Sequence, residues 1–140
     1  MVVKIVTDST SDIPKEVAEE LGIMVVPANV HFDLDTFRDG VDIQADQFYH
    51  RLMTGPVLPK TSAPSPGLFK ECYDGLARES HEIISIHVSS KLSATYGSAL
   101  AGKQDISNCR VEVVDSKLTS MGLGLLAITA AKAARTGAKI

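Results

Sequence analysis

The sequence has no tryptophan, few aromatic residues (5%) and only two cysteines. The scattered aromatic side chains offer no platform on which nucleic-acid bases could stack. Seventeen acidic and fourteen basic residues give a formal net charge of −3, so a broad basic surface for nucleic acid is not expected either. Cys72 and Cys109 lie far apart and form no Cys-x-x-Cys pair, which argues against a disulfide framework and against a cysteine zinc site. We expect two reduced thiols, as is usual in a cytoplasmic protein.

Long hydrophobic runs are also missing. The most apolar stretch, residues 121–134, is too short to span a bilayer and is interrupted by Lys132, so we interpret it as a buried helix. The first residues, MVVKIVTDSTSD, lack the basic and apolar regions of a signal peptide. We therefore expect a cytoplasmic protein without a transmembrane segment. Its 140 residues fit one domain with a hydrophobic core of its own.

Short apolar segments alternate with segments of helical periodicity. The apolar segments do not alternate with polar residues, which is typical of parallel strands buried on both faces. This order predicts a three-layer α/β/α domain with a mostly parallel sheet. The expected strands are residues 2–7, 23–26, 83–88 and 110–114, and the expected helices include residues 13–21, 92–103 and 119–136.

The middle of the chain lacks the uninterrupted apolar segments that predict buried parallel strands. Residues 30–34 alternate apolar and polar side chains, which predicts a half-exposed strand, and an amphipathic helix around Phe48 follows. Residues 55–67 hold four of the six prolines, and we expect an ordered loop there. Ser65 is a candidate N-cap with Pro66 at the first helical position. In the helix that follows, Leu68, Cys72 and Leu76 are expected to mark the buried face, with Phe69 and Tyr73 beside them.

Hydroxyl-rich segments follow three of the expected strands: residues 8–12, 89–93 and 115–117. Ligands of parallel α/β sheets bind at the carboxyl ends of the strands, and the start of a helix can hold a phosphate or a carboxylate. The alternative is that Asp8 and one of these serines simply cap helices. Thr61 and Ser62 also allow two interpretations: they could hold a ligand, or they could form a structural turn.

Other motifs do not meet their structural requirements. Residues 122–127 match Gly-x-Gly-x-x-Ala but do not directly follow a strand, so close helix packing explains these glycines better than a dinucleotide site. Asp33, Asp35 and Asp39 do not fit a calcium loop and indicate a hairpin. The histidines lack metal-ligand spacing, and His87 is expected to be a packed histidine. We therefore expect ligand holding without catalysis, metal or cofactor. One rival is a small hydrolase or phosphotransferase using Asp8 and the 89–93 turn, and another is a structural or interaction domain that binds nothing alone.

Three stretches in register carry a family resemblance: KIVTDSTSD at residues 4–12, KTSAPSP at residues 60–66 and HVSSKLSATY at residues 87–96. In this order and spacing they resemble the DegV family of bacterial fatty-acid-binding proteins. Residues 38–42 and 113–116 fit the same pattern, so the likeness covers essentially the whole chain.

The resemblance implies a two-domain protein, of which this chain matches the N-terminal α/β domain while the second domain is absent. It implies a long-chain fatty acid in a tunnel between the domains, with its carboxylate held by hydroxyls that correspond to Thr61, Ser62 and Ser93. Ser9 and Ser90 lie in the matching motifs and would surround that site. Some members present the fatty acid to a dihydroxyacetone-kinase-like fatty acid kinase, and the carrier itself catalyses nothing.

Two physical expectations complete this interpretation. Thr61, Ser62 and Ser93 should converge on one point, while Lys60 and Lys91 steer an anion toward it. Without the second domain, apolar side chains near the site should be open to solvent. We therefore expect the chain alone to associate with itself through this face and to bind fatty acid weakly or not at all.

Overall fold

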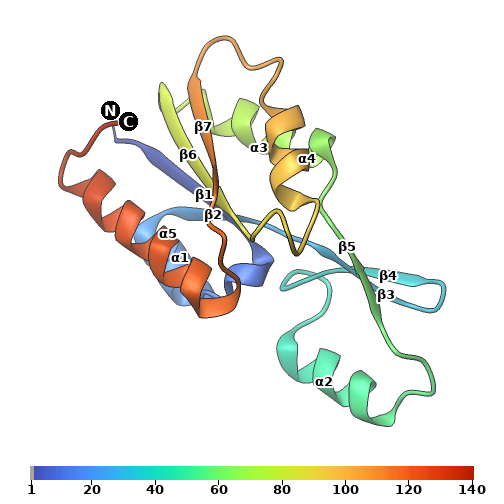
Figure 1. Ribbon diagram of the computed structural model, residues 1–140. Coiled ribbons are helices and arrows are strands. Elements are labelled where there is room, and N and C mark those ends of the chain that lie inside the picture. The colour runs from blue at the N-terminus through green and yellow to red at the C-terminus, as the bar shows by residue number, and fades with distance from the viewer. Residues whose placement is uncertain (1) are drawn as a thin grey trace.

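The computed structural model describes residues 2–140 and contains two β-sheets (Figure 1). The larger sheet is entirely parallel, in the order β2-β1-β6-β7. Its strands are β1 (Lys4–Asp8), β2 (Ile23–Val26), β6 (Glu82–His87) and β7 (Arg110–Asp115). The smaller sheet is antiparallel, in the order β4-β3-β5. Its strands are β3 (Asn29–Phe32), β4 (Asp35–Arg38) and β5 (Lys60–Ser62).

Helices cover both faces of the parallel sheet (Figure 1). One face carries α1 (Lys15–Leu21) and α5 (Ser120–Arg135), and the other carries α3 (Pro66–Leu76) and α4 (Thr95–Gly102). A short 3-10 helix, η1 (Ser9–Ser11), follows β1. This arrangement confirms the predicted three-layer fold with a parallel sheet.

The parallel strands are buried on both faces, as their uninterrupted apolar composition predicted. On one face Val6 packs in a cluster with Phe69 and Tyr73 of α3. On the other face its neighbour Ile5 packs in a cluster with Ala127 and the rest of the small-residue stripe of α5. Successive residues of one strand therefore belong to two different cores.

The predicted buried face of α3 was right at Leu76 but wrong by one position at Leu68 and Cys72. The fully buried side chains are Phe69 and Tyr73, together with Leu76, whereas Leu68 and Cys72 are only half-buried. The two aromatic rings bury the most apolar area, so they occupy the centre of the contact with the sheet. The predicted cap is confirmed, because the Ser65 hydroxyl accepts the backbone N–H of Leu68 at 3.2 Å.

Helix α4 begins later than the predicted residue 92. Residues 89–93 form a turn in which the N–H groups of Leu92 and Ser93 both donate to the carbonyl of Ser89. The Ser93 hydroxyl then accepts the N–H of Thr95, the first helical residue, at 3.2 Å. A serine that binds a backbone N–H two positions later favours a turn over a helix interior.

The proline-rich segment contains a strand that the sequence did not reveal. Its residues Lys60–Ser62 form β5, which pairs with β3. The prolines fall outside these three residues, so none of them removes a hydrogen bond from the ladder. The predicted strand at residues 30–34 also ends early, at Phe32, and Leu34 lies in the exposed hairpin turn.

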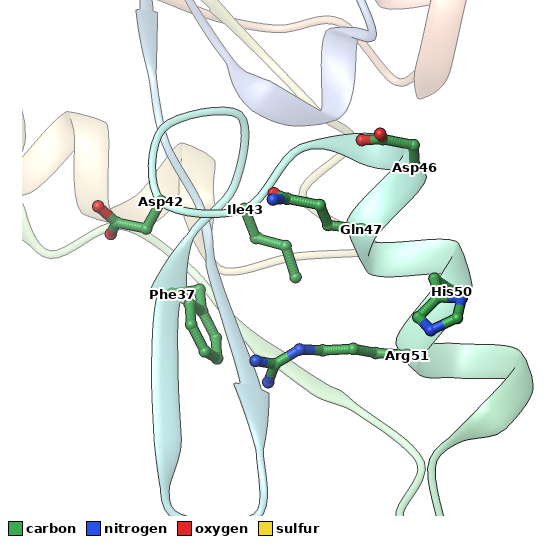
Figure 2. Close-up of a pocket in the computed structure, with 7 residues that line it drawn as sticks. All are labelled: Phe37, Asp42, Ile43, Asp46, Gln47, His50 and Arg51. Atoms are coloured by element: carbon green, nitrogen blue, oxygen red, sulfur yellow. The ribbon is translucent and has the colours of Figure 1, made fainter.

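We call residues 29–62 the lobe: the antiparallel sheet with α2 (Ala45–Thr54) packed against one face of it. Its core is small, with only Val30, Phe32 and Ile43 fully buried among half-buried aromatic side chains. Helix α2 has no buried residue. Figure 2 shows the guanidinium group of Arg51 directed at the ring of Phe37, whose centroid lies 4.7 Å from it.

Candidate ligand-binding site

The carboxyl ends of β1 and β6 are held together by a buried aspartate. Asp8 is completely buried, and its Oδ1 accepts both the N–H and the hydroxyl of Thr10, at 3.1 and 2.5 Å. Its Oδ2 accepts the N–H of Val88 at 3.1 Å and contacts Nδ1 of His87 at 2.9 Å. Burial raises the pKa of Asp8, but the hydrogen bonds from His87, Thr10 and Val88 outweigh it and hold the pKa below its ordinary value. Asp8 therefore ties η1 to the end of β6.

A chain of buried side chains continues from this aspartate into the core. Because Asp8 can only accept, His87 donates through Nδ1, and its Nε2 accepts from the Ser85 hydroxyl at 2.6 Å. Tyr73 in turn donates to Ser85 at 2.8 Å. The order Ser–His–Asp resembles that of a hydrolase triad, but all of these side chains are fully buried. No substrate can reach Ser85, and His87 is confirmed as a packed histidine.

Two further aspartates bind the neighbouring loops to one another. Asp115 accepts the hydroxyl and the N–H of Ser90, at 2.6 and 3.1 Å, and the N–H of Lys117 at 3.0 Å. The hydrogen bond from the Ser90 hydroxyl is the main reason why the pKa of Asp115 is lowered. Asp12 accepts the hydroxyl of Ser120 at 2.6 Å. The carboxylates at this edge thus serve to fix the loops.

Backbone strain is concentrated in the same loops. Among residues 2–140, four residues other than glycine have positive φ, and three of them lie here: Asp12, Lys117 and Ser120, with φ of 52°, 57° and 53°. Such conformations are costly for residues with a Cβ and are found at ligand sites more often than elsewhere. The strain therefore marks this edge as a candidate site.

The predicted site residues have different surroundings. Ser9 accepts the N–H of Ala28 at 3.0 Å, and Ser90 is bound to Asp115, so both hydroxyls are engaged within the protein. Ser93 exchanges a hydrogen bond with the Thr95 hydroxyl at 2.8 Å. Ser62 is exposed and contacts Nε2 of His31 at 2.9 Å. None of the hydrogen bonds found in residues 2–140 joins Thr61, Ser62 and Ser93 to one another.

Thr61 and Ser62 point to opposite faces of the lobe sheet. Thr61 lies opposite Val30 of β3, on the face that packs against α2, whereas Ser62 lies opposite Asn29. Residues that face each other across strands share one side of a sheet, and successive residues alternate. The side chains of Thr61 and Ser62 therefore lie on opposite sides of β5.

The lobe reaches the carboxyl edge of the parallel sheet through α3. Strand β5 leads directly into α3 (Figure 1), and the Phe69 ring in the first turns of that helix packs edge-on against His87, with centroids 5.0 Å apart. Because His87 ends β6, this contact brings the start of α3 next to the loop that carries Ser93.

Exposed apolar side chains accompany the hydroxyl-rich loops. The N–H of Ser89 donates to the carbonyl of Leu118 at 2.9 Å, which holds the loops after β6 and β7 side by side. A Cβ at Gly124 would lie 2.5 Å from the carbonyl oxygen of Ser11, so this glycine lets α5 pack closely on η1, as the sequence predicted. We call the exposed side chains there the apolar edge: Leu92 (68% exposed), Leu118 (45%), Met121 (37%) and Leu125 (59%).

Two of the grooves in residues 2–140 are not lined by Thr61, Ser62 or Ser93. One, of about 530 Å³, runs between β4 and α2 and is lined by Phe37, Asp42 and Arg51 among others (Figure 2). The other, of about 520 Å³, lies beside η1 and α1 and includes Ser9 in its wall. Within residues 2–140, no group of three His, Cys, Asp or Glu side chains could hold a metal ion. In the same part of the chain, no helix is long and apolar enough to cross a membrane.

Comparison with known proteins accounts for this architecture. The family described as "Uncharacterised protein, DegV family" matches residues 2–140. The chain belongs to the DegV family. A DegV domain-containing protein of Clostridium perfringens is 38% identical over 135 residues, covering 96% of this chain and 48% of the relative.

Solved DegV structures share the fold. DegV from Bacillus subtilis, described as a fatty acid binding protein, superimposes with a TM-score of 0.94 at 34% identity, over 98% of this chain and 49% of that one. A stearic acid-binding protein from Eubacterium ventriosum gives a TM-score of 0.90 at 30% identity, over 99% and 49%. The chain therefore spans about half the length of the DegV proteins it matches.

Sequence reasoning missed the residues that surround Ser62. His31 contacts Ser62 and Thr36, and Asn29 also donates to Ser62. The polar positions of the alternating segment at residues 30–34 gave a partial signal. Their relation to Ser62 depends on the pairing of β3 with β5, and that pairing was not predicted.

Proposed function

We propose that this chain is the N-terminal part of a cytoplasmic fatty-acid carrier. In this proposal the carboxylate of a long-chain fatty acid is bound by the hydroxyls of Thr61, Ser62 and Ser93. The observation that carries the proposal is the group of hydroxyl-rich loops beside an exposed apolar edge, in a fold shared with proteins described as fatty acid binding.

The chemistry of the edge favours an anionic ligand held by neutral donors. Asp8, Asp12 and Asp115 are already engaged by the loops, so hydroxyls are the groups left to meet a ligand. Hydrogen bonds to a carboxylate are stronger than those between neutral groups. Lys60 and Lys91 flank the two hydroxyl clusters in sequence and are exposed, and their charge draws an anion toward them.

The apolar edge suits an acyl chain. Fully burying a large aliphatic side chain contributes roughly 1.5–3 kcal/mol of favourable free energy. The four side chains of the apolar edge are only partly buried in this chain. We propose that the acyl chain and a second domain cover them together in a two-domain protein. The half-length match to the relatives supports this division. Without that cover, the chain should associate with itself through the apolar edge.

The proposal does not include catalysis. A hydrolase or phosphotransferase using Asp8 is disfavoured, because this carboxylate is fully buried and both of its oxygens are occupied. We propose instead that the bound carboxylate is presented to a dihydroxyacetone-kinase-like fatty acid kinase, the partner that the family resemblance implies.

Binding of oleate by the purified chain tests the proposal. Thr61→Ala and Ser93→Ala should each weaken binding by roughly 1–3 kcal/mol, because each leaves the carboxylate short of one donor. Ser98→Ala, at a half-exposed serine on α4, is the matched control and should bind as the wild type does. Isothermal titration gives the affinity, and sedimentation gives the state of association. Wild-type affinity in both test variants would place the carboxylate elsewhere.

A further inference from the structure

The face of the lobe sheet opposite α2 carries only polar and basic strand residues. The strand pairing places Asn29 and His31 of β3 on this face with their neighbours across the sheet. None of these six side chains is acidic, and all are half-exposed or exposed. The full set is Asn29, His31, Thr36, Arg38, Lys60 and Ser62.

Hydrogen bonds on this face run toward the Ser62 hydroxyl. The side-chain amide of Asn29 donates to Ser62 at 3.3 Å. Nε2 of His31 lies 2.9 Å from the same oxygen, and Nδ1 lies 2.9 Å from the hydroxyl of Thr36. When His31 carries its proton on Nε2, it donates to Ser62 and accepts from Thr36. Ser62 then accepts two hydrogen bonds, and its own proton is free to donate outward.

The face also holds an uncompensated positive charge. The guanidinium group of Arg38 is bound by Asp42 through two hydrogen bonds of 2.9 Å, and the Arg38 contacts lower the pKa of Asp42 to about 2. That pair is therefore neutral overall. Lys60, directly opposite His31 on β5, takes part in none of the ion pairs found in residues 2–140.

We propose that His31 and Lys60 complete the carboxylate site on this face. His31 acts as a positioning residue that orients Ser62 as a donor, and Lys60 supplies the charge. This inference rests on the proposed function and adds to it the side chains that orient the Ser62 hydroxyl and supply positive charge beside it. An anion that accepts from Ser62 must select the Nε2–H form of His31, since in the other tautomer the proton of Ser62 is bound to Nε2.

Nuclear magnetic resonance of the full chain with octanoate as the probe tests this assignment. The imidazole nitrogen signals of His31 should move toward the Nε2–H tautomer as octanoate binds. His31→Leu and Ser62→Ala should each weaken octanoate binding about 5- to 10-fold, the loss expected for one hydrogen bond. The double variant should be no weaker than either single one. His31→Gln, which keeps an N–H donor, should retain most of the affinity, and Lys60→Gln should lose about 3-fold.

His50→Leu is the matched control, because His50 lies on α2 and lines the groove between β4 and α2, away from the proposed face. Unchanged His31 signals at saturating octanoate, or wild-type affinity in His31→Leu, would overturn the assignment. If Ser93→Ala weakens binding while His31→Leu and Ser62→Ala do not, the carrier function stands and this inference fails. If the wild-type chain binds no octanoate at all, this inference fails, because all of the side chains that it names lie in this chain.

Discussion

The parallel-sheet unit and the lobe differ in how many of their side chains are buried. The parallel sheet has cores on both faces and a fully buried polar chain from Tyr73 to Asp8. The lobe has three fully buried apolar residues and a helix with none. A segment with few buried contacts opens locally at low free-energy cost. In the candidate site, Ser93 belongs to the parallel-sheet unit, whereas Thr61 and Ser62 belong to the lobe. A ligand bound by all three would therefore connect a rigid region with one that opens more easily.

The contrast also lies in how each region uses its polar groups. Around the parallel sheet Asp8 and Asp115 bridge loops, and each of them contacts at least three hydrogen-bond donors. In the lobe the Arg38–Asp42 pair is exposed to solvent, and exposed ion pairs contribute little to stability. We therefore expect substitutions in the first region to alter global unfolding and those in the second to alter local opening.

Truncation of an aromatic ring should separate the two regions most clearly. Phe69→Ala removes a fully buried ring of the main core and should lower the free energy of unfolding by about 3–5 kcal/mol. Phe48→Ala removes a half-buried ring of the lobe and should cost less than about 2 kcal/mol. Urea unfolding followed by far-ultraviolet circular dichroism measures both. Equal losses would show that the lobe is as well packed as the parallel-sheet unit.

Removing the charge of the Asp8 carboxylate should cause the next largest loss of stability. Asp8→Asn directs an amide N–H toward groups that already donate, so we expect a loss of about 2–3 kcal/mol at pH 7. Because the pKa of Asp8 is lowered in the folded chain, its contribution is complete above its unfolded pKa of about 3.9 and is lost as pH falls through the folded value. The difference between variant and wild type should therefore shrink in acid.

Urea titrations at pH 7 and at pH 3 measure that difference. Asp33→Asn in the exposed hairpin turn is the control, since asparagine tolerates the positive φ of this position, and it should change stability by less than about 0.5 kcal/mol. A difference between Asp8→Asn and wild type that stays constant from pH 7 to pH 3 would contradict the role given to the carboxylate.

A methyl group at Gly124 should test how closely α5 must pack on η1. Gly124→Ala places a Cβ 2.5 Å from the carbonyl oxygen of Ser11, a backbone atom, and should cost about 1–3 kcal/mol. Gly97→Ala on α4 meets nothing within 4 Å and should be neutral or should stabilise by up to about 1 kcal/mol. Thermal unfolding of the two variants side by side gives the result. A stable Gly124→Ala chain would mean that α5 shifts without penalty.

The smallest effect should come from the cation–π contact in the lobe. Arg51→Met removes the charge that lies over the Phe37 and Phe32 rings and should cost about 0.5–1 kcal/mol. Hydrogen exchange should show faster opening of α2 and β4 amides, with β1 and β6 amides unchanged. Arg78→Met, an exposed arginine outside the lobe, should leave both sets of amides unchanged. Faster exchange throughout the molecule would contradict local opening of the lobe.

The sequence predicted the parallel-sheet unit well because its signals are local and repeated. Uninterrupted apolar strands, the Ser65 cap and the small-residue stripe of α5 each reflect one short stretch of chain, and the structure confirms them. The start of α4 was misplaced because the turn at residues 89–93 uses serine hydroxyls that compete with helix formation. The face of α3 was misplaced because two adjacent apolar stripes satisfy the same periodicity.

The candidate site was predicted in its residue types but not in its arrangement. Hydroxyls at the ends of strands marked the edge, and the family motifs selected Thr61, Ser62 and Ser93 from them. The opposite orientation of Thr61 and Ser62, and the contact of Ser62 with His31, depend on the pairing of β5 with β3. That pairing joins residues about thirty positions apart through three weakly patterned residues, which carry too little local signal to predict a strand.

Composition and periodicity by themselves determined the three layers and the four parallel strands, because burial depends on the local pattern of apolar residues. Tertiary structure alone decided which polar side chains are engaged in hydrogen bonds within the protein. Nothing in the sequence distinguished Asp8, closed in by Thr10, His87 and Val88, from a reactive aspartate. The availability of a side chain depends on partners that are distant in the chain and meet only when strands pair and helices pack.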